Sequence, residues 1–370
     1  MEGDFIKIND WLLPLSWIYG AGVRLRNQMF EMGMLKSRSF DIPVISVGNI
    51  TVGGSGKTPH VEYLINLLRD KVKVAVLSRG YKRKSKGYML ATADTPMSDI
   101  GDEPYQMKKK FADIYVAVDK DRCHGIDQLT ANEETSDTDV ILLDDAYQHR
   151  YVKPGVNILL VDYHRLIMYD KLLPAGRLRE PQKGKARADI VIVSKCPAEL
   201  KPMEFRVITK AMNLFPYQKL YFTTLKYGSL RPIYGGEDRK LDTLTGDTSI
   251  LLLTGIASPQ QMIVDLKPYT ERITPLTFPD HHQYTDADID RINAEFEAMK
   301  GNDKMIVTTE KDNARLCGME GLSDEVKKNI YVLPVEVGFM LDQEEDFNEN
   351  IIGYVRKNSR NSILAKRKDD

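Results

Sequence analysis

Short apolar runs alternate with longer amphipathic stretches along most of the chain past residue 40. The runs are rich in Val, Ile and Leu, a composition that predicts strands buried on both faces. These strands are expected at residues 42–47, 72–77, 114–118, 139–143, 156–161 and 190–194, with helices between them at residues 58–69, 103–111, 123–131 and 199–211. The alternation is typical of βα units that build a mostly parallel sheet.

A second series of elements follows a stretch rich in Tyr, Gly and Pro at residues 217–236, which is predicted to be a connector with one or two extended pieces. Beyond it, strands are expected at residues 250–253, 305–308 and 330–335, and helices at residues 259–267, 287–300 and 346–357. Thr285 and Asp288 have the spacing of a capping box at the start of one of these helices. The chain of 370 residues also exceeds the roughly 250–300 residues over which one hydrophobic core grows, so two domains are expected.

Composition and charge narrow the class of protein. A content of 42% apolar and 28% charged residues is that of a globular protein, and a formal net charge of −1 gives no overall field for binding nucleic acid. The three separated cysteines form neither a disulfide framework nor a zinc-binding Cys-x-x-Cys pair, so a reducing cytosol fits best.

The N-terminal segment at residues 11–23 is uncharged and rich in aromatic and aliphatic residues. It is shorter than the ~20 apolar residues of a spanning helix, and Pro14, Gly20 and Gly22 interrupt it. A secretory signal is not expected, because Arg24 follows where a small-residue cleavage site would stand. Two interpretations remain open: a helix that packs on the core, and an interfacial segment whose tryptophans and flanking arginines contact an anionic membrane surface.

The strongest chemical signal follows the first predicted strand. A glycine-rich turn, then Lys57 and Thr58, then a helix is the arrangement in which backbone N–H groups hold phosphates, the lysine reaches the β- and γ-phosphates, and the threonine binds Mg²⁺. The nucleotide-binding residues are predicted to be Gly53, Gly54, Ser55, Gly56, Lys57 and Thr58. The spacing departs from the usual motif, because Thr51 stands where its first glycine is expected.

Carboxylates stand at two further places where phosphate chemistry uses them. Asp144 and Asp145 end an apolar strand, as expected for Mg²⁺ ligands at the carboxyl edge of a sheet. Asp102 precedes a predicted helix with Glu103 beside it, and its carboxylate is suited either to accept the proton of an attacking hydroxyl or to cap the helix. After a later strand, Pro197 stands where a GTPase carries the aspartate that recognises guanine, so ATP is favoured over GTP.

The remaining candidates have weaker local signals. Three of the six histidines have no informative context and are expected to be surface or packing residues: His60, His124 and His164. His149 follows the aspartate pair, and His281 lies in a Pro-Asp-His-His sequence, but neither has metal-binding spacing. The loop at residues 78–86 surrounds Tyr81 with five cations and is either a solvated loop or a contact for an anionic substrate or the membrane surface.

Taken together, these motifs closely resemble the tetraacyldisaccharide 4′-kinase family of lipid A biosynthesis over nearly the whole chain. In order, they occupy residues 14–20, 46–59, 77–81, 101–104, 144–149, 173–180, 255–257 and 278–282. The family shares the unusual glycine spacing. Departures from its pattern are Ala146 and Tyr147, where Gly and Phe are commoner, and Arg177, where Pro is expected.

The resemblance implies ATP-dependent phosphorylation, with Mg²⁺, of the 4′-hydroxyl of a tetraacylated glucosamine disaccharide 1-phosphate, which forms lipid IVA. It implies that Asp102 is the general base, that His281 orients it, and that Lys57 contacts phosphate. Thr58, Asp144 and Asp145 are then expected around Mg²⁺. Residues expected near the acceptor are Tyr81, Glu103, Arg122, Gln148, His149 and Arg179.

The fold implied by the resemblance is α/β: a P-loop NTPase-type α/β/α sandwich, a second and smaller α/β/α domain, and a short β linker. The expected boundaries are an N-terminal membrane-associated helical segment at residues 1–36, a P-loop kinase domain at 37–216, the linker at 217–236 and a C-terminal α/β domain at 237–370. Because the acceptor is a lipid, the resemblance favours a monotopic protein on the cytoplasmic face of a Gram-negative inner membrane, with no nucleic acid and no obligate protein partner. A P-loop ATPase that drives assembly or metal insertion without an acceptor hydroxyl is the alternative.

Overall fold

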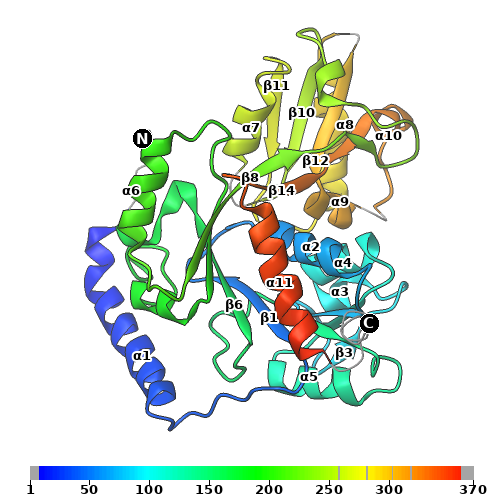
Figure 1. Cartoon of the computed structure of the whole chain (residues 1–370). Coiled ribbons are helices and arrows are strands. Elements are labelled where there is room, and N and C mark those ends of the chain that lie inside the picture. The colour runs from blue at the N-terminus through cyan, green and yellow to red at the C-terminus, as the bar shows by residue number, and fades with distance from the viewer. Residues whose placement is uncertain (1–7, 257–258, 281, 302, 317–318, 360–370) are drawn as a thin grey trace. The chain divides into compact units, whose positions relative to one another are not determined.

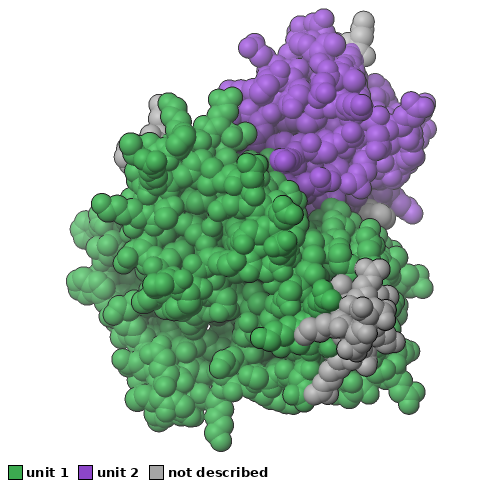
Figure 2. Space-filling model, in the orientation of Figure 1, with its two compact units in different colours: residues 1–225, 337–370 green, residues 226–336 purple. Residues whose placement is uncertain are grey.

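The chain forms two compact units (Figure 2). Each has its own sheet and hydrophobic core. The computed structural model describes residues 8–256, 259–280, 282–301, 303–316 and 319–359. Unit 1 is made of the described residues up to 225 and from 337 onward, and unit 2 of those between 226 and 336.

Unit 1 is built on a nine-stranded sheet with the strand order β14-β8-β7-β6-β1-β5-β2-β4-β3. Figure 1 shows the chain with the labelled helices and strands. Its strands are β1 (Val44–Asn49), β2 (Val74–Ser78), β3 (Met89–Leu90), β4 (Tyr115–Val118), β5 (Val140–Asp144), β6 (Val156–Asp162), β7 (Ile190–Ser194), β8 (Lys219–Tyr227) and β14 (Val335–Phe339). The neighbours from β8 across to β4 pair in parallel, and β3 pairs antiparallel with β4. Strands β1, β2, β5 and β7 are buried along their whole length, as their apolar composition predicts.

Helices pack on both faces of this sheet. On one face, α2 (Lys57–Leu68), α4 (Asp102–Lys110) and α11 (Glu344–Asn358) share an apolar core with the strands. On the other, α5 (Arg122–Ala131) and α6 (Pro202–Met212) do the same. The remaining helical segments described in unit 1 are η1 (Asp10–Leu12), α1 (Leu13–Glu31), α3 (Met97–Ile100), η2 (Tyr163–Arg165), η3 (Ile167–Tyr169) and η4 (Gln182–Arg187).

Unit 2 is a smaller α/β structure with a five-stranded sheet in the order β11-β10-β12-β13-β9. Its strands are β9 (Arg231–Pro232), β10 (Ser249–Thr254), β11 (Ile273–Thr277), β12 (Lys304–Thr309) and β13 (Ile330–Leu333). Its helical segments are η5 (Leu241–Thr243), α7 (Gln260–Leu266), α8 (Asp286–Ala298), α9 (Glu310–Leu316) and α10 (Asp324–Asn329). Helix α8 covers one face of the sheet and α7 the other. The expected α/β class, with a larger and a smaller domain, is therefore confirmed.

The predicted capping box at α8 is also confirmed. The side chain of Thr285 accepts a hydrogen bond from the backbone N–H of Asp288, whose carboxylate accepts the backbone N–H of Thr285 in return. These reciprocal bonds satisfy two N–H groups that a helix start leaves without partners.

The structure differs from the expected division at the linker and at the C-terminal end. Residues 219–227, expected in a connector, form β8 in the interior of the large sheet, where Tyr221, Phe222 and Thr223 are buried. The chain also returns to unit 1 at residue 337, whereas one domain was expected over residues 237–370. The reason lies in α11, whose apolar stripe of every fourth residue completes the core of unit 1: Phe347, Ile351 and Val355.

Helix α1 buries small residues and exposes large apolar ones. Ser16 and Gly20 are buried against the rest of unit 1. On the opposite face, Ile18 and Leu25 are seven residues, or two helical turns, apart and are 70% and 59% exposed. Trp11, in η1 directly before α1, is 93% exposed. Among the described residues, no helix has the length and apolar character needed to cross a membrane.

Candidate active site

The phosphate loop predicted from the sequence connects β1 to α2. Lys57 is the first residue of α2, a helix of 12 residues, and Gly56 before it is the N-cap with a φ of 79°. This left-handed conformation is open to glycine without the strain that a Cβ would add. The loop therefore ends at a helix N-terminus, where free N–H groups and the helix dipole favour a phosphate.

His60 supports this loop, although the sequence indicated no role for it. Its Nδ1 lies 2.7 Å from the carbonyl oxygen of Gly56, and its Nε2 lies 3.0 Å from the hydroxyl of Thr223 on β8. Burial lowers the pKa of His60 to about 4, so the ring is neutral at physiological pH, with one nitrogen that donates and one that accepts. Because the partner on β8 is 163 residues away, local sequence carries no signal of this contact.

Asp145 lies between two cations beside the phosphate loop. Its Oδ1 is 3.6 Å from Lys57 Nζ, and Arg179 Nη1 donates to its Oδ2 at 3.2 Å. Burial disfavours the charged carboxylate, but the positive charges of Lys57 and Arg179 outweigh burial and hold the pKa of Asp145 below its ordinary value. The structure thus brings together three residues that the sequence had only proposed.

Asp144 offers an oxygen that fits a divalent cation. It ends β5 next to Val47 of β1, and its Oδ2 accepts a hydrogen bond of 3.2 Å from Ser78. Its Oδ1 is buried and has no hydrogen-bond partner among the described residues. Burial, together with the charges of Glu103 and Asp145, raises the pKa of Asp144 to about 7. Because a cation at Oδ1 would favour the ionised form, this oxygen fits a Mg²⁺ site. Thr58, the second residue of α2, stays a predicted ligand.

Asp102 is the first residue of α4, and Gly101 is the N-cap. The suggestion that Asp102 itself caps the helix is therefore wrong. Gly101 has a φ of 91°, and a Cβ there would lie 2.9 Å from the carbonyl oxygen of Tyr81. Only a glycine allows this close approach, which brings the basic loop at residues 78–86 against the start of α4. The effect of the Glu103 charge on Asp144 indicates that this helix start also lies near the end of β5.

The segment at residues 172–180 pairs directly with the phosphate loop. The N–H of Val52 donates to the carbonyl of Arg177 at 2.8 Å, and the N–H of Arg179 donates to the carbonyl of Ile50 at 2.7 Å. Gln148 Nε2 donates to the carbonyl of Asn49 at 2.6 Å, and its Oε1 accepts from Arg179 at 3.3 Å. Arg179 and Gln148 are thus fixed beside Asp145, and their expected place near the acceptor stays a prediction.

Arg122 and His149 lie at the same carboxyl edge of the sheet. Arg122 is buried, and its Nη2 is 3.4 Å from the carbonyl oxygen of Asp144. Burial lowers its pKa to about 10, which leaves it charged at neutral pH. Burial and the positive charge of Arg122 lower the pKa of His149 to about 4, so this ring is neutral.

His149 also forms a group that sequence spacing did not indicate. One ligand atom each from Asp121, Cys123 and His149 lies within 4.8 Å of the others. The carboxylate of Asp121 already accepts the N–H of Cys123 at the start of α5. Since Arg122 and Arg79 place positive charge near the His149 ring, the surroundings disfavour a metal cation there.

His281 lies outside the described residues, so the role implied for it stays a prediction. Its neighbour His282 is described, and the Nε2 atom of that ring lies 2.9 Å from Asp288 in the capping box of α8. Phe278 stacks on the same ring at 4.8 Å.

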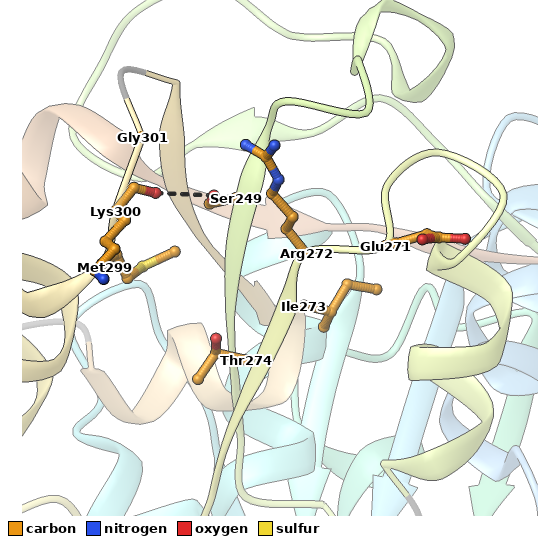
Figure 3. Close-up of a pocket in the computed structure, with 8 residues that line it drawn as sticks. All are labelled: Ser249, Glu271, Arg272, Ile273, Thr274, Met299, Lys300 and Gly301. Carbon is orange, nitrogen blue, oxygen red and sulfur yellow. Dashed lines mark hydrogen bonds between the residues drawn. The ribbon is translucent and has the colours of Figure 1, made fainter.

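An open pocket of about 520 Å³ in unit 2 lies away from the carboxyl ends of its strands (Figure 3). Ser249 begins β10, Ile273 begins β11, and Gly301 comes shortly before β12. At its wall, the Ser249 hydroxyl donates to the carbonyl of Lys300 at 3.1 Å. Open α/β sheets bind ligands at the carboxyl ends of their strands, so this pocket is not a candidate for the predicted chemistry.

Comparison with known proteins gives the same family across the chain. The family model described as "Tetraacyldisaccharide-1-P 4'-kinase" matches residues 8–356. The tetraacyldisaccharide 4'-kinase of Phocaeicola vulgatus is 61% identical over 366 residues, which cover 99% of this chain and all of the relative. That of Bacteroides thetaiotaomicron is 54% identical, with 100% and 99% covered.

A solved structure is similar to the whole fold. It is the crystal structure of LpxK from Aquifex aeolicus, described as an "apo" form in complex with ATP. The two proteins are 32% identical, with a TM-score of 0.70, and the alignment covers 93% of this chain and 98% of the other.

Proposed function

Because the chain belongs to the tetraacyldisaccharide 4′-kinase family, we propose that it transfers the γ-phosphoryl group of ATP to the 4′-hydroxyl of a tetraacylated glucosamine disaccharide 1-phosphate. The product is lipid IVA. The alternative, a P-loop ATPase without an acceptor hydroxyl, is not favoured, because the relatives are named as kinases.

One observation in the structure supports this proposal most directly. The phosphate loop that leads to Lys57 lies beside β5, which ends at Asp144, and Arg179 contacts the carboxylate of Asp145 directly after it. Phosphoryl transfer needs positive charge around the transferred group and a positioned hydroxyl more than it needs covalent chemistry. Lys57 and Arg179 supply positive charge, the two aspartates are suited to hold a cation, and the N–H groups at the start of α2 supply further donors to phosphate oxygens.

The reaction requires a base for the attacking hydroxyl, and we assign this role to Asp102. As the 4′-oxygen forms its bond to the γ-phosphorus, the bond from that phosphorus to the β–γ bridging oxygen breaks and ADP leaves with the electron pair. The carboxylate of Asp102 accepts the hydroxyl proton. Thr58, Asp144 and Asp145 would hold Mg²⁺, which when bound supplies positive charge to the β- and γ-phosphate oxygens.

The acceptor is assigned to the groups around the same sheet edge. Arg122 and Arg179 are cations suited to an anionic acceptor, and neutral His149 and Gln148 are suited to sugar hydroxyls. Tyr81 is 57% exposed in the basic loop at residues 78–86, and an aromatic face of this kind is suited to a sugar ring.

We assign α1 to the cytoplasmic surface of the inner membrane. The exposed Ile18 and Leu25 of α1, with Trp11 of η1 before them, are suited to the boundary between headgroups and acyl chains, and Arg24 and Lys36 are exposed nearby for anionic lipids. A helix lying in that interface would keep the phosphate loop at the surface where a lipid acceptor is found.

The test is mass spectrometry of a tetraacyldisaccharide 1-phosphate incubated with the purified protein, detergent, Mg²⁺ and ATP. We expect the mass of the acceptor to increase by one phosphate, and the increase to be absent with Lys57→Ala. Consumption of ATP with no change in the mass of the lipid would contradict the proposal and favour the ATPase.

A further inference from the structure

Three consecutive carbonyl groups of the phosphate loop each contact a side chain. Lys195 Nζ donates to the carbonyl of Gly54. The Ser194 hydroxyl donates to the carbonyl of Ser55 at 2.9 Å, and His60 Nδ1 lies 2.7 Å from the carbonyl of Gly56. Ser194 ends β7 and Lys195 follows it, so two of the three contacts come from one strand end.

Each of these side chains is itself held by a neighbouring strand. Asp162 at the end of β6 binds Lys195 Nζ at 3.0 Å, in an ion pair whose two side chains are only 15% and 18% exposed. Thr223 of β8 contacts His60 at 3.0 Å. Lys195 has a φ of 58°, a left-handed conformation that is uncommon for a lysine and costs free energy. The contacts around Lys195 are what compensate for that cost.

The orientation of a peptide group decides what the loop presents to a phosphate. A peptide N–H points away from its own carbonyl, so a carbonyl that is bound on the outside of the loop turns the next N–H toward the inside. The side chains that bind the carbonyls of Gly54, Ser55 and Gly56 therefore also fix the direction of the next N–H groups. These N–H groups belong to Ser55, Gly56 and Lys57. A carbonyl that turned inward would repel the phosphate oxygens.

We propose that Lys195, held by Asp162, is a positioning residue that keeps the phosphate loop in its ATP-binding conformation. This inference rests on the proposed function, since it names how the same site obtains its affinity for the triphosphate. The lysine amine contacts the backbone of the phosphate loop. Its loss should therefore weaken the binding of the phosphate groups, whichever base the nucleotide carries. The loop after β7, which carries base recognition in GTPases, here supports the phosphate loop.

The experiment measures the affinity for a non-hydrolysable ATP analogue with Mg²⁺ by isothermal titration calorimetry, in detergent and without lipid. For Lys195→Met, which keeps the length of the side chain and removes the charge, we expect a ~10-fold rise in Kd, the effect of losing one charged hydrogen bond. Lys195→Arg restores a donor and should retain most of the affinity. Lys210→Met, an exposed lysine of α6, is the matched control and should bind as the wild type does.

A double-mutant cycle tests the part assigned to Asp162. If Asp162 acts through Lys195, then Asp162→Asn weakens binding by itself, but adds little in the Lys195→Met background. The analogous GTP compound serves as a second probe: Lys195→Met should weaken both nucleotides by the same factor. A change confined to one base would overturn the proposal in favour of base recognition.

Failure of the inference is distinguishable from failure of the proposed function. If Lys195→Met binds the ATP analogue as tightly as the wild type and phosphorylates the lipid at the same KM for ATP, the positioning role is overturned and the kinase stands. If the wild type binds the analogue but phosphorylates no lipid, the proposed function fails, and the titrations still decide the role of Lys195. Thermal unfolding of each variant identifies any that has lost its fold, and Lys195→Arg then provides the comparison.

Discussion

The hydroxyl of Tyr19 donates a hydrogen bond of 2.7 Å to the carbonyl oxygen of Arg179. Tyr19 belongs to α1, and the N–H of Arg179 donates to Ile50 at the start of the phosphate loop. A second contact is made by Ser16 of α1, whose hydroxyl donates to the carbonyl of Leu172 at 3.0 Å. The helix with the exposed apolar face is thus joined through one segment to the loop that is predicted to hold ATP.

Tyr19→Phe should weaken catalysis without releasing the protein from membranes. Losing one hydrogen bond, worth about 1 kcal/mol, loosens the backbone at Arg179, whose side chain contacts Asp145. We expect kcat/KM to fall by a few fold in a lipid kinase assay, with unchanged sedimentation with vesicles. Tyr217→Phe is the matched control, because Tyr217 donates an equally short bond of 2.7 Å to the backbone of Ala186. Equal effects of the two variants would argue against a specific link through Arg179.

The membrane role of α1 is best tested on its exposed face. Ile18→Glu combined with Leu25→Glu should abolish sedimentation with anionic vesicles, since each change places a charge where apolar surface would be buried. The unfolding temperature should stay close to that of the wild type because both side chains are more than half exposed. Gln28→Glu, an exposed position on the same helix, is the control for charge alone. Deleting the helix would be a poorer test, because it also removes Ser16 and Tyr19 from the segment beside the phosphate loop.

Gly101→Ala should displace the start of α4 and lower kcat. The added Cβ would lie 2.9 Å from the carbonyl oxygen of Tyr81, in a residue with a φ of 91°. A displacement of about 1 Å at a catalytic group costs up to ~10²-fold in rate, and the affinity for ATP should change little. Gly87→Ala is the control: its φ is 69°, but apart from its chain neighbours no described residue has an atom within 4 Å of the added Cβ. A comparable loss in both variants would assign the effect to backbone strain alone.

Local sequence predicted the parts of the site that lie close together along the chain. The loop from Gly53 to Thr58 follows from a strand, a turn and a helix in direct succession. The aspartates at the end of β5 follow from a single apolar strand, so short-range patterns were sufficient for both. The contact of His60 with Thr223 joins residues 163 apart, and that of Tyr19 with Arg179 joins residues 160 apart. Such pairs depend on which strands become neighbours, and a single sequence does not encode this in any local pattern.

The same limit explains the errors in the fold. The abundance of Tyr, Gly and Pro at residues 217–236 predicted a connector with one or two extended pieces, but not that residues 219–227 form an interior strand of the large sheet. The return of the chain to unit 1 was missed because an amphipathic helix such as α11 shows that it needs an apolar partner but not which sheet provides it.

Asp102→Asn should separate catalysis from ATP binding. A base that accepts the hydroxyl proton contributes ~10²–10⁴-fold to kcat, and Asp102 at the start of α4 is not part of the phosphate loop. For each variant, single-turnover transfer to the lipid gives the rate of the chemical step, and titration with an ATP analogue gives the affinity for the nucleotide. Asp99→Asn, three residues earlier in α3, is the control and should transfer phosphate at the wild-type rate. Full activity of Asp102→Asn would remove Asp102 from the role of base.

His60 should make the protein less stable as the pH falls below its ordinary pKa. In the folded protein burial lowers the pKa of His60 from 6.5 to about 4, so between these two values the unfolded chain binds more protons. Stability from this group is therefore complete above pH 6.5 and is lost as the pH falls toward 4. Between pH 7 and pH 5 the loss amounts to about 2 kcal/mol.

Thermal unfolding at pH 7 and pH 5 checks this expectation with two variants. His60→Gln removes the ionisable ring, so its unfolding temperature should fall less on acidification than that of the wild type, although the variant is less stable at pH 7. His124→Gln is the control, because a hydrogen bond to Asp119 raises the pKa of His124. A raised pKa adds stability at low pH and loses it as the pH rises, so this variant should keep the acid-dependent fall. If the unfolding temperature of His60→Gln falls as steeply as that of the wild type between pH 7 and pH 5, protonation of another group causes the loss of stability. The His60 ring is then not the group responsible.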